Sequence, residues 1–549
     1  MSNMLRSPSI GPVVGHTTTN SARIWMRGSV EAPGQTVGIA ALYDANGNYL
    51  ADSARYLRLH REYDRTGVVD FTDLNPETTY IVRLGSLTLD STDAMVAIED
   101  DELFSKLPTA EALRDDLEKL SPEESVATFT TYPVSADKGL SFIFGSCRYP
   151  GLLWTAKKTD HIFGAILEKF RSSNAPRFLM MVGDQIYADK IHRLIPIERA
   201  DTPSEFHECY ATAFTSPNMR ALLRTVPTYM ILDDHEIEDN WVKGRMDRDA
   251  DKRILFQTAI SAYMSYQWIH CPRNYGPRGE VLGADGDKLF YSFECGGYPF
   301  FVMDSRTQRI RDDYDYNLDD NHLLGYPSKP SAPEYRGQIN ILCDWLVSQQ
   351  KQFGDRAKFI VSPSVFVPNG VETAGSDEDE RARRKKCEND SWAAFPATRR
   401  QLLQTIVNEN IQNVVFLCGD VHCSCIAEIS FTHKTIGPLP LRAFCITSSA
   451  FYWPWAFADG DPLSFVHDSI QENDDFVVND NVVMNYKAYG FEQDDNFTHI
   501  DVIHDEIIVQ NYDRDGKALG DKIKVALAVP EGAQSFVSAD ALNGDLSGS

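Results

Sequence analysis

Thiol, carboxylate, phenol and imidazole side chains follow short apolar runs at several places in the sequence. They belong to Cys147, Asp184, Tyr187, Asp234, His235, Asp420 and His422. All of these side-chain types can bind a metal ion, and carboxylate and imidazole also serve as general acids and bases. Each residue alone has an ordinary structural explanation, such as a buried thiol or a hydrogen-bonded histidine. Ionisable groups that recur after buried strands are costly unless they share a counter-charge, which a metal centre would supply.

The stretch Arg177–Asp189, RFLMMVGDQIYAD, indicates how such residues are positioned. Its apolar residues Phe178–Val182 suit a strand that is buried on both faces. Gly183 allows a tight turn, and in a following helical turn Asp184 and Tyr187 share one face because they lie three residues apart. Open α/β sheets bind ligands at the carboxyl ends of their strands, so this pair would point into a site. The alternative is a capping aspartate and a tyrosine at the edge of the core.

Apolar strands alternate with amphipathic helices from Gly139 onward, and this order is typical of a layered α/β fold. The predicted strands are Leu140–Phe144, Phe178–Val182, Thr228–Leu232, Pro299–Arg306, Lys358–Ser364 and Val414–His422. The predicted helices include Pro203–Leu223, Asp249–His270, Arg336–Phe353 and Trp392–Asn410. The remainder of the chain, including Ile500–Asp513, is predicted to be mostly β-structure.

Short strands separated by turns fill Gly11–Tyr132 and predict an antiparallel β-sandwich. The acidic stretch Asp90–Glu124 interrupts them, and we expect a solvated insertion there with one or two helices. We therefore expect a sandwich domain at residues 1–135, a catalytic domain at 136–535 and a disordered tail at 536–549.

The formal charge of −26 disfavours non-specific nucleic-acid binding, which needs a basic surface. The basic run Arg381–Lys386 directly follows the acidic residues Asp377–Glu380, so it suits a solvated, charge-compensated loop. No apolar run is long enough to span a bilayer. The start lacks the layout of a secretory signal, which predicts a cytoplasmic protein, or a secreted or periplasmic one if a leader has been removed. The ten scattered cysteines favour buried thiols over a disulfide framework.

Five blocks of the sequence resemble the signature blocks of PhoD-like alkaline phosphatases. They are GSCR, GDQIYAD, ILDDHEIEDNW, FFVMDSRTQR and LCGDVHCS. This family belongs to the calcineurin-like metallophosphoesterases and is related to the purple acid phosphatases, and the resemblance covers about Gly139 to His422. It implies a layered α/β/β/α sandwich with an N-terminal antiparallel β-sandwich domain. It also implies hydrolysis of small-molecule phosphate esters.

The resemblance assigns roles to single residues. Cys147 stands where the first block usually has an aspartate ligand, and Asp184 matches the carboxylate that bridges both metal ions. Tyr187 matches the phenolate ligand of purple acid phosphatases. Asp234 takes the place of an asparagine, and His235 matches the catalytic histidine that follows it.

The last block and its neighbour depart from the family pattern. Asp420 and His422 match two histidines, while the region Ser362–Ser364 lacks the histidine of a separate block. One implied site consists of Cys147, Asp184, Tyr187 and His422. Its thiolate and phenolate favour Fe³⁺. The other consists of Asp184, Asp234 and Asp420. Its hard oxygens suit Ca²⁺, or else Mn²⁺ or Mg²⁺, and zinc is the main competitor.

The implied mechanism is attack on phosphorus by a hydroxide that bridges the two metal ions. His235 would contact the transition state or protonate the leaving oxygen, and Asn240 would hold His235 or the phosphate. Arg306, and less strongly Arg148, would neutralise phosphate oxygens. For Arg306 a salt bridge with Asp304 is an equal alternative.

Two other functions fit the same residues. The centre could belong to a phosphodiesterase or phosphotriesterase specialist, or to a catalytically silent protein whose metal ions are structural. The aromatic run FYWPWAF at Phe451–Phe457 is core, or a rim whose rings stack on the organic group of an ester. The oligomeric state is undetermined by the sequence.

Overall fold

The structure is a computed structural model. It describes residues 5–29, 35–89, 100–135, 137, 139–151, 156–189, 199–273, 288–329, 331, 336–373, 380–455, 460–503 and 505–527. The predicted tail at 536–549 and residues 90–99 of the predicted insertion lie outside these ranges. None of the described helices combines the length and the apolar character that a bilayer span requires.

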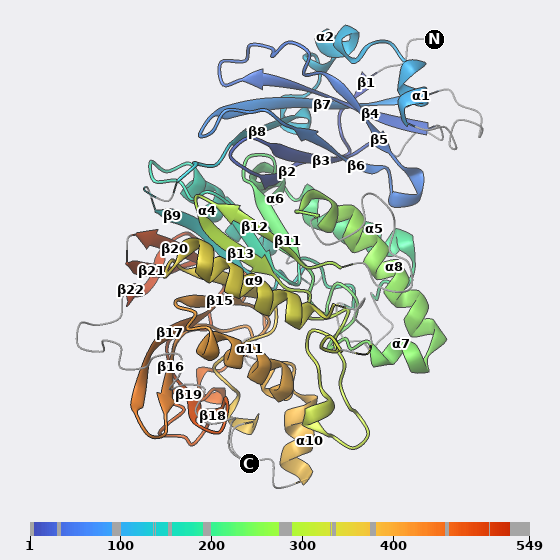
Figure 1. Cartoon of the computed structure of the whole chain (residues 1–549). Coiled ribbons are helices and arrows are strands. Elements are labelled where there is room, and N and C mark those ends of the chain that lie inside the picture. The colour runs from blue at the N-terminus through green and yellow to red at the C-terminus, as the bar shows by residue number, and fades with distance from the viewer. Residues whose placement is uncertain are drawn as a thin grey trace.

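The N-terminal part is an antiparallel sandwich of two sheets, as predicted. One sheet contains β1 (Leu5–Arg6), β7 (Thr79–Leu89), β4 (Gln35–Asp44) and β5 (Arg55–Leu59), with β8 (Val126–Thr130) paired to β7. The other contains β2 (Ile10–Thr17), β3 (Ala22–Arg27) and β6 (Thr66–Phe71). Alternate residues of both sheets, such as Ile24 and Val82, form the shared core. Figure 1 shows this sandwich at the top of the molecule.

The acidic insertion is less solvated than the sequence indicates. It contains the short helices α1 (Asp100–Ser105), α2 (Arg114–Leu117) and α3 (Pro122–Ser125). Leu103 and Leu117 are fully buried against residues of the first sandwich sheet. The insertion therefore covers apolar surface of that sheet.

Two larger sheets follow. The first has the order β11 (Thr228–Ile231), β10 (Leu179–Val182), β9 (Leu140–Gly145), β20 (Asn496–Ile503), β21 (Glu506–Asp513), β22 (Ala518–Ala526). The second has the order β12 (Tyr291–Cys295), β13 (Tyr298–Val302), β14 (Lys358–Ser362), β15 (Val414–Cys418), β17 (Gly437–Thr447), β16 (Ser424–His433), β19 (Val482–Glu492), β18 (Phe476–Val477). The strands β9 to β11 are parallel, and so are β13, β14, β15 and β17.

The helices lie around these sheets. They are α4 (Ala156–Phe170), α5 (Pro203–Thr215), α6 (Pro217–Leu223), α7 (Gly244–Arg248), α8 (Ala250–Tyr266), α9 (Gln338–Phe353), α10 (Glu380–Glu388) and α11 (Pro396–Asn408). Short 3₁₀ helices are Arg61–Tyr63, Ala110–Leu113, Trp268–His270, Leu318–Asp320, Val371–Thr373, Trp392–Ala394 and Pro462–Ser464.

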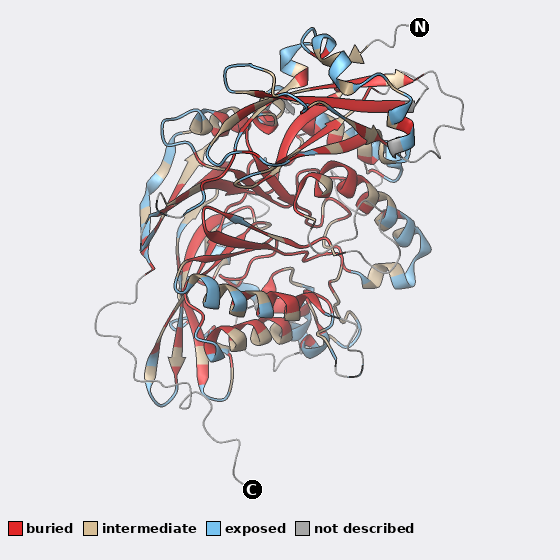
Figure 2. Cartoon of the chain, turned by 45° about the horizontal axis from the view of Figure 1, so that its top comes forward, coloured by how far each residue is buried: buried red, intermediate tan, exposed pale blue. Residues whose placement is uncertain are grey.

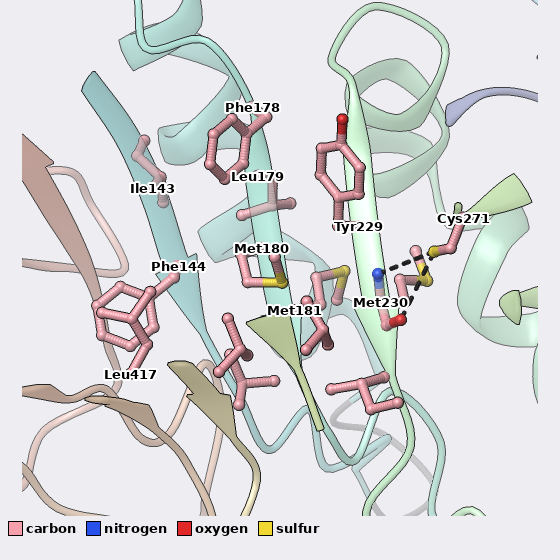
Figure 3. Packing of buried hydrophobic residues seen from close by; sticks show 14 of the residues in the cluster. Ile143, Phe144, Phe178, Leu179, Met180, Met181, Tyr229, Met230, Cys271 and Leu417 are labelled. Atoms are coloured by element: carbon pink, nitrogen blue, oxygen red, sulfur yellow. Dashed lines mark hydrogen bonds between the residues drawn. The ribbon is translucent and has the colours of Figure 1, made fainter. Parts of the chain in front are cut away.

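Successive side chains of a strand point to opposite faces of the sheet, so they belong to different packed layers. Phe300 and Phe359 point toward the first sheet, where their rings lie 5.5 and 5.4 Å from the ring of Phe142. The next residues, Phe301 and Ile360, belong to a different cluster that includes residues of α9 and α11. The core between the sheets is rich in aromatic residues and methionine, as Figure 3 shows around β9, β10 and β11. The predicted α/β/β/α sandwich is confirmed.

The N-terminal sandwich packs directly on α5 and α8. Trp25 of β3 donates its indole N–H to the backbone oxygen of Ser265 in α8 at 2.8 Å. The Trp25 ring lies 5.6 Å from that of Tyr266 and 6.3 Å from that of Phe214. Figure 2 shows buried residues continuing from one part into the other. The domain boundary that we place near residue 135 falls between β8 and β9 and stays a prediction.

Some predicted elements differ in their limits. The helix predicted over Pro203–Leu223 is two helices, because Pro217 has no N–H to donate and the residue before it, Ser216, is extended at ψ 138°. The strands predicted to reach Arg306 and His422 end at Val302 and Cys418. The residues beyond those ends form loops, and the candidate site is built from them.

The aromatic core between the two sheets predicts a large loss of stability on truncation of Phe300. Its ring is fully buried and lies 4.6 to 5.5 Å from the rings of Phe359, Phe293, Phe178 and Phe142. We expect Phe300→Ala to lower the free energy of unfolding by about 3–5 kcal/mol. Urea denaturation followed by tryptophan fluorescence measures this change. The control Tyr314→Ala, at a side chain 71% exposed, should cost less than about 1 kcal/mol, and equal losses would contradict the packing described.

Candidate functional site

The polar residues predicted from the sequence follow strands whose carboxyl ends meet. Cys147 follows β9, Asp184 follows β10, Asp234 follows β11 and Asp420 follows β15. In the first sheet β9, β10 and β11 are parallel to one another, and in the second sheet β15 is parallel to β14 and β17. The two sheets face one another, so the loops converge at one edge. Distant segments of the chain thereby form a single site.

The backbone of this site is unusual. Five candidate residues other than glycine have a positive φ, in the left-handed region. They are Cys147 (58°), Asp184 (57°), Asn240 (53°), Asp420 (76°) and His422 (50°). This conformation costs about 1–2 kcal/mol per residue, and such strain is concentrated at functional sites. The adjacent Gly183 has φ 90°, and a Cβ there would lie 2.4 Å from Cβ of Asp233. A side chain at this position would push the loops after β10 and β11 apart.

Cys147 and Asp184 are in direct contact. The Cys147 thiol lies 3.4 Å from Oδ2 of Asp184, and Ser449 donates its hydroxyl to the same sulfur at 3.2 Å. Ser449 also accepts the backbone N–H of His422 at 3.0 Å, which ties His422 to this cluster. The Tyr187 ring stacks on His235 with centroids 4.2 Å apart.

Potential metal ligands form two groups, and within each group all ligand atoms lie within 4.8 Å of one another. The first contains Asp184, Asp234 and His235, and the second contains Asp233, Asp234 and Asp420. Neither group includes Cys147 or His422. Asp234 belongs to both groups. The sequence analysis instead predicts that Asp184 is the carboxylate shared by both metal sites.

Arg306 lies inside the acidic cluster. Its fully buried guanidinium forms ion pairs with Asp233 and Asp390. Its Nη2 lies 3.6 Å from Oδ1 of Asp234 and 3.9 Å from Oδ1 of Asp420. These partners replace the salt bridge with Asp304 that was the alternative for Arg306. Asp304 instead accepts the backbone N–H groups of Arg306 and Thr307 at 3.1 and 2.9 Å.

A second buried arginine, Arg309, supports this arrangement. It forms an ion pair with Asp390 and donates to the hydroxyl of Ser364. Ser364 lies in the region Ser362–Ser364 that the sequence analysis compares with the histidine block, and the structure shows an arginine contact there. Burial works against ionisation of Asp390, but Arg306 and Arg309 hold its pKa well below the usual value. The predicted phosphate contact Arg148 points elsewhere, because its Nη2 donates to Ser216 at 3.1 Å.

Glu236 connects the loops after β10 and β11. Its buried carboxylate accepts the backbone N–H groups of Asp184 at 3.0 Å, Gln185 at 2.8 Å and Asp233 at 2.8 Å. The side chain of Gln267 adds a fourth hydrogen bond at 3.1 Å. Burial raises the pKa of Glu236 to about 7, although these hydrogen bonds favour the ionised form. Glu236 thus sets the distance between Asp184 and Asp233.

His235 is oriented by a carboxylate that the sequence analysis did not select. Its Nδ1 lies 2.7 Å from Oδ1 of Asp189, and Asp189 is held by the backbone N–H of Asp239 at 2.7 Å. Burial lowers the pKa of His235, but Asp189 and Asp234 outweigh it and raise the pKa well above its usual value. The side chain of Asn240 donates to Asp239, so its contact with His235 is indirect.

The carboxylates of the site carry more negative charge than the positively charged side chains around them neutralise. Burial raises the pKa of Asp184 well above its usual value, and the charge of Asp234 adds to the shift. Burial and the charges of Asp233 and Asp390 do the same for the pKa of Asp420. The hydroxyl of Tyr187 is buried and has no hydrogen-bond partner among the described residues. The buried carboxylates need protons or further cations, and metal ions would supply this positive charge.

Sequence reasoning missed several residues of this cluster. Asp233, Asp189 and Glu236 lie inside the recognised blocks ILDDHEIEDNW and GDQIYAD, so their place in the blocks was a usable signal. Asp390 lies in a loop with no motif, 81 residues from its partner Arg309. No feature of the sequence indicated that pairing.

Comparisons with known proteins identify the family of the chain. The sequence profile of the PhoD-like phosphatase family matches residues 153–456. Alkaline phosphatase D of Bacillus subtilis (strain 168) is 25% identical over 302 residues, which cover 52% of this chain and 46% of that protein. The chain therefore spans less than half the length of this curated relative in the matched region.

A solved structure supports the fold. The structure of PhoD superposes with a TM-score of 0.61 at 15% sequence identity, over 97% of this chain and 94% of that chain. At this identity the likeness concerns the fold alone.

The hydrogen bonds of Glu236 predict a specific loss on its removal. Glu236→Ala leaves three buried backbone N–H groups without an acceptor, and each such group costs about 1–3 kcal/mol. We expect the free energy of unfolding, measured by urea denaturation, to fall by about 3–5 kcal/mol. The matched control is Glu205→Ala, whose exposed carboxylate also accepts two backbone N–H groups and should cost about 1 kcal/mol. A similar loss in both variants would argue against the bracing role of Glu236.

Proposed function

The chain belongs to the PhoD-like phosphatase family, and from this premise we propose that it is a metal-dependent phosphoesterase. The observation that carries the proposal is the pair of carboxylate groups that share Asp234 and lie beside His235. Asp184, Asp233, Asp234 and Asp420 would hold the metal ions, which would supply polarisation of phosphate oxygens and activation of water as the nucleophile. The substrates are small-molecule phosphate esters.

The donor types suggest which metal ions the site takes. Cys147, Asp184 and Tyr187 offer a thiolate, a carboxylate and a phenolate, which favour Fe³⁺, with His422 as a further candidate ligand. Asp233, Asp234 and Asp420 offer only oxygen, which suits Ca²⁺. Four carboxylates, those of Asp233, Asp234, Asp390 and Asp420, face two guanidinium groups. When all four carboxylates are ionised, the excess of two negative charges matches one divalent cation, and manganese, magnesium and zinc are alternatives.

His235 is the proposed acid. Because Nδ1 is held by Asp189, the ring presents Nε2 to a ligand. Asp189 and Asp234 outweigh burial and raise the pKa of His235, which favours the protonated ring, whose Nε2–H can donate to a phosphoryl oxygen or protonate the leaving oxygen. Asp189 is a positioning residue, and Asn240 supports it through Asp239.

The main role of Arg306 is to neutralise the carboxylates around it. Its guanidinium is surrounded by Asp233, Asp390, Asp234 and Asp420. It therefore reduces the repulsion among these residues and keeps them close enough to share a cation. A direct contact between Arg306 and the phosphate stays a prediction.

Removal of Asp184 should abolish metal binding and hydrolysis together, because its carboxylate faces Cys147, and it shares a ligand group with Asp234 and His235. The test is metal analysis of freshly purified Asp184→Asn, alongside assays with aryl phosphate mono-, di- and triesters. A coloured wild-type protein, from charge transfer between thiolate or phenolate and Fe³⁺, would support iron. The exposed variant Asp116→Asn is the control and should keep metal and activity. Wild-type protein that hydrolyses none of the esters with any of these metals would refute the proposal.

Changes at His235 should affect turnover and its pH dependence. We expect His235→Ala to retain the metal ions and to lower kcat by roughly 10²–10⁴-fold. Asp189 raises the pKa of His235, so Asp189→Asn lowers that pKa and moves the alkaline limb of the pH–rate profile to lower pH. The surface pair His161 and Asp515 is the matched control, and Asp515→Asn should leave the profile unchanged. An alkaline limb that stays in place in Asp189→Asn would exclude His235 as the acid.

A further inference from the structure

Aromatic rings form one side of the candidate site. A cluster, the aromatic wall, consists of Tyr149, Tyr187, Tyr452, Trp453 and Trp455. The Trp453 ring stacks on the candidate ligand His422 with centroids 3.7 Å apart and an interplanar angle of 12°. It lies 6.2 Å from the ring of Tyr187, which itself stacks on His235. The wall therefore adjoins the proposed metal ligands directly.

The aromatic wall is held in place by the same backbone that carries Cys147. Tyr149 donates its N–H to the backbone oxygen of Tyr452 at 3.1 Å, and Tyr452 donates to that of Cys147 at 3.2 Å. The backbone N–H of Trp453 donates to Oδ1 of Asp495 at 2.9 Å. These bonds fix the wall relative to the site before any ligand arrives, which reduces the entropy lost on binding.

The wall has a buried and a partly exposed part. Tyr149, Tyr187 and Tyr452 are buried, whereas Trp453 and Trp455 keep part of their surface exposed. Trp455 packs its ring 4.5 Å from that of Tyr149 and 5.0 Å from that of Trp453. The indole nitrogen of Trp453 is buried without an acceptor among the described residues, so ring contacts hold this side chain. Partly exposed indoles beside an ionic cluster offer a flat apolar surface that phosphate binding does not need.

We propose that Trp453 and Trp455 bind the organic group of the substrate and that this group carries a flat aromatic ring close to phosphorus. This inference rests on the proposed phosphoesterase function. The carboxylates with their cations hold the phosphoryl group, and the indoles stack on the ring of the leaving alcohol. The substrate class is thus an ester of a ring-bearing alcohol, in contrast to small aliphatic phosphate esters.

The test compares benzyl phosphate with ethyl phosphate. Both are monoesters of primary alcohols, so they differ chiefly in the ring. Trp455 is the residue to change because its ring packs against those of Tyr149 and Trp453, which are not proposed metal ligands. We expect Trp455→Leu to lower kcat/KM for benzyl phosphate about tenfold and that for ethyl phosphate less than about twofold.

The matched control is Trp345→Leu, which changes another partly buried tryptophan, in α9, with a ring contact to Phe301 at 5.4 Å. This control variant should leave kcat/KM unchanged for both esters. Equal losses for both esters in Trp455→Leu, or no loss for benzyl phosphate, would overturn the inference.

Binding of non-hydrolysable analogues separates this inference from the proposed function. Calorimetry with benzylphosphonate and ethylphosphonate measures affinity without turnover. Tighter binding of benzylphosphonate that disappears in Trp455→Leu supports the aromatic subsite even if no ester is hydrolysed. Equal affinities of the two phosphonates for the wild-type protein would refute the subsite and leave the phosphoesterase proposal intact.

Discussion

Carboxylates crowded into a buried space are the constraint from which the candidate site follows. Asp184, Asp233, Asp234 and Asp420 lie together at one edge of two facing sheets. In a medium of low dielectric constant the mutual repulsion of their ionised forms is large, so the ionised cluster requires cations. Arg306 supplies one inside the cluster, and Arg309 supports it through Asp390. The charge that remains is the physical reason for proposing metal ions.

Such a cluster needs a rigid frame. The carboxyl ends of β9, β10, β11 and β15 bring the side chains together, and short turns with left-handed backbones aim them. The packed aromatic core between the sheets and the hydrogen bonds of Glu236 hold those turns in place. Stability in the core and strain at the loops are thus two parts of one arrangement.

The site combines two chemical environments. The carboxylates, the arginines and His235 form an ionic side that suits a phosphoryl group. The aromatic wall around Trp453 adjoins it through the stacked ring of His422. One residue thereby connects the proposed metal ligands to the surface that we assign to the organic part of the substrate.

Apolar runs, turn residues and ordered blocks determined much of this protein on their own. Hydrophobic periodicity depends on neighbouring residues, so the strands that end before Cys147, Asp184, Asp234 and Asp420, and the N-terminal sandwich, could be predicted from the sequence. Tertiary structure alone decided the partners of those residues. Arg306 joins Asp233 and Asp390, Asp189 orients His235, and Asp234 is shared by both carboxylate groups. Charges and hydrogen bonds act through space between segments far apart in the chain, and no local pattern records which of them meet.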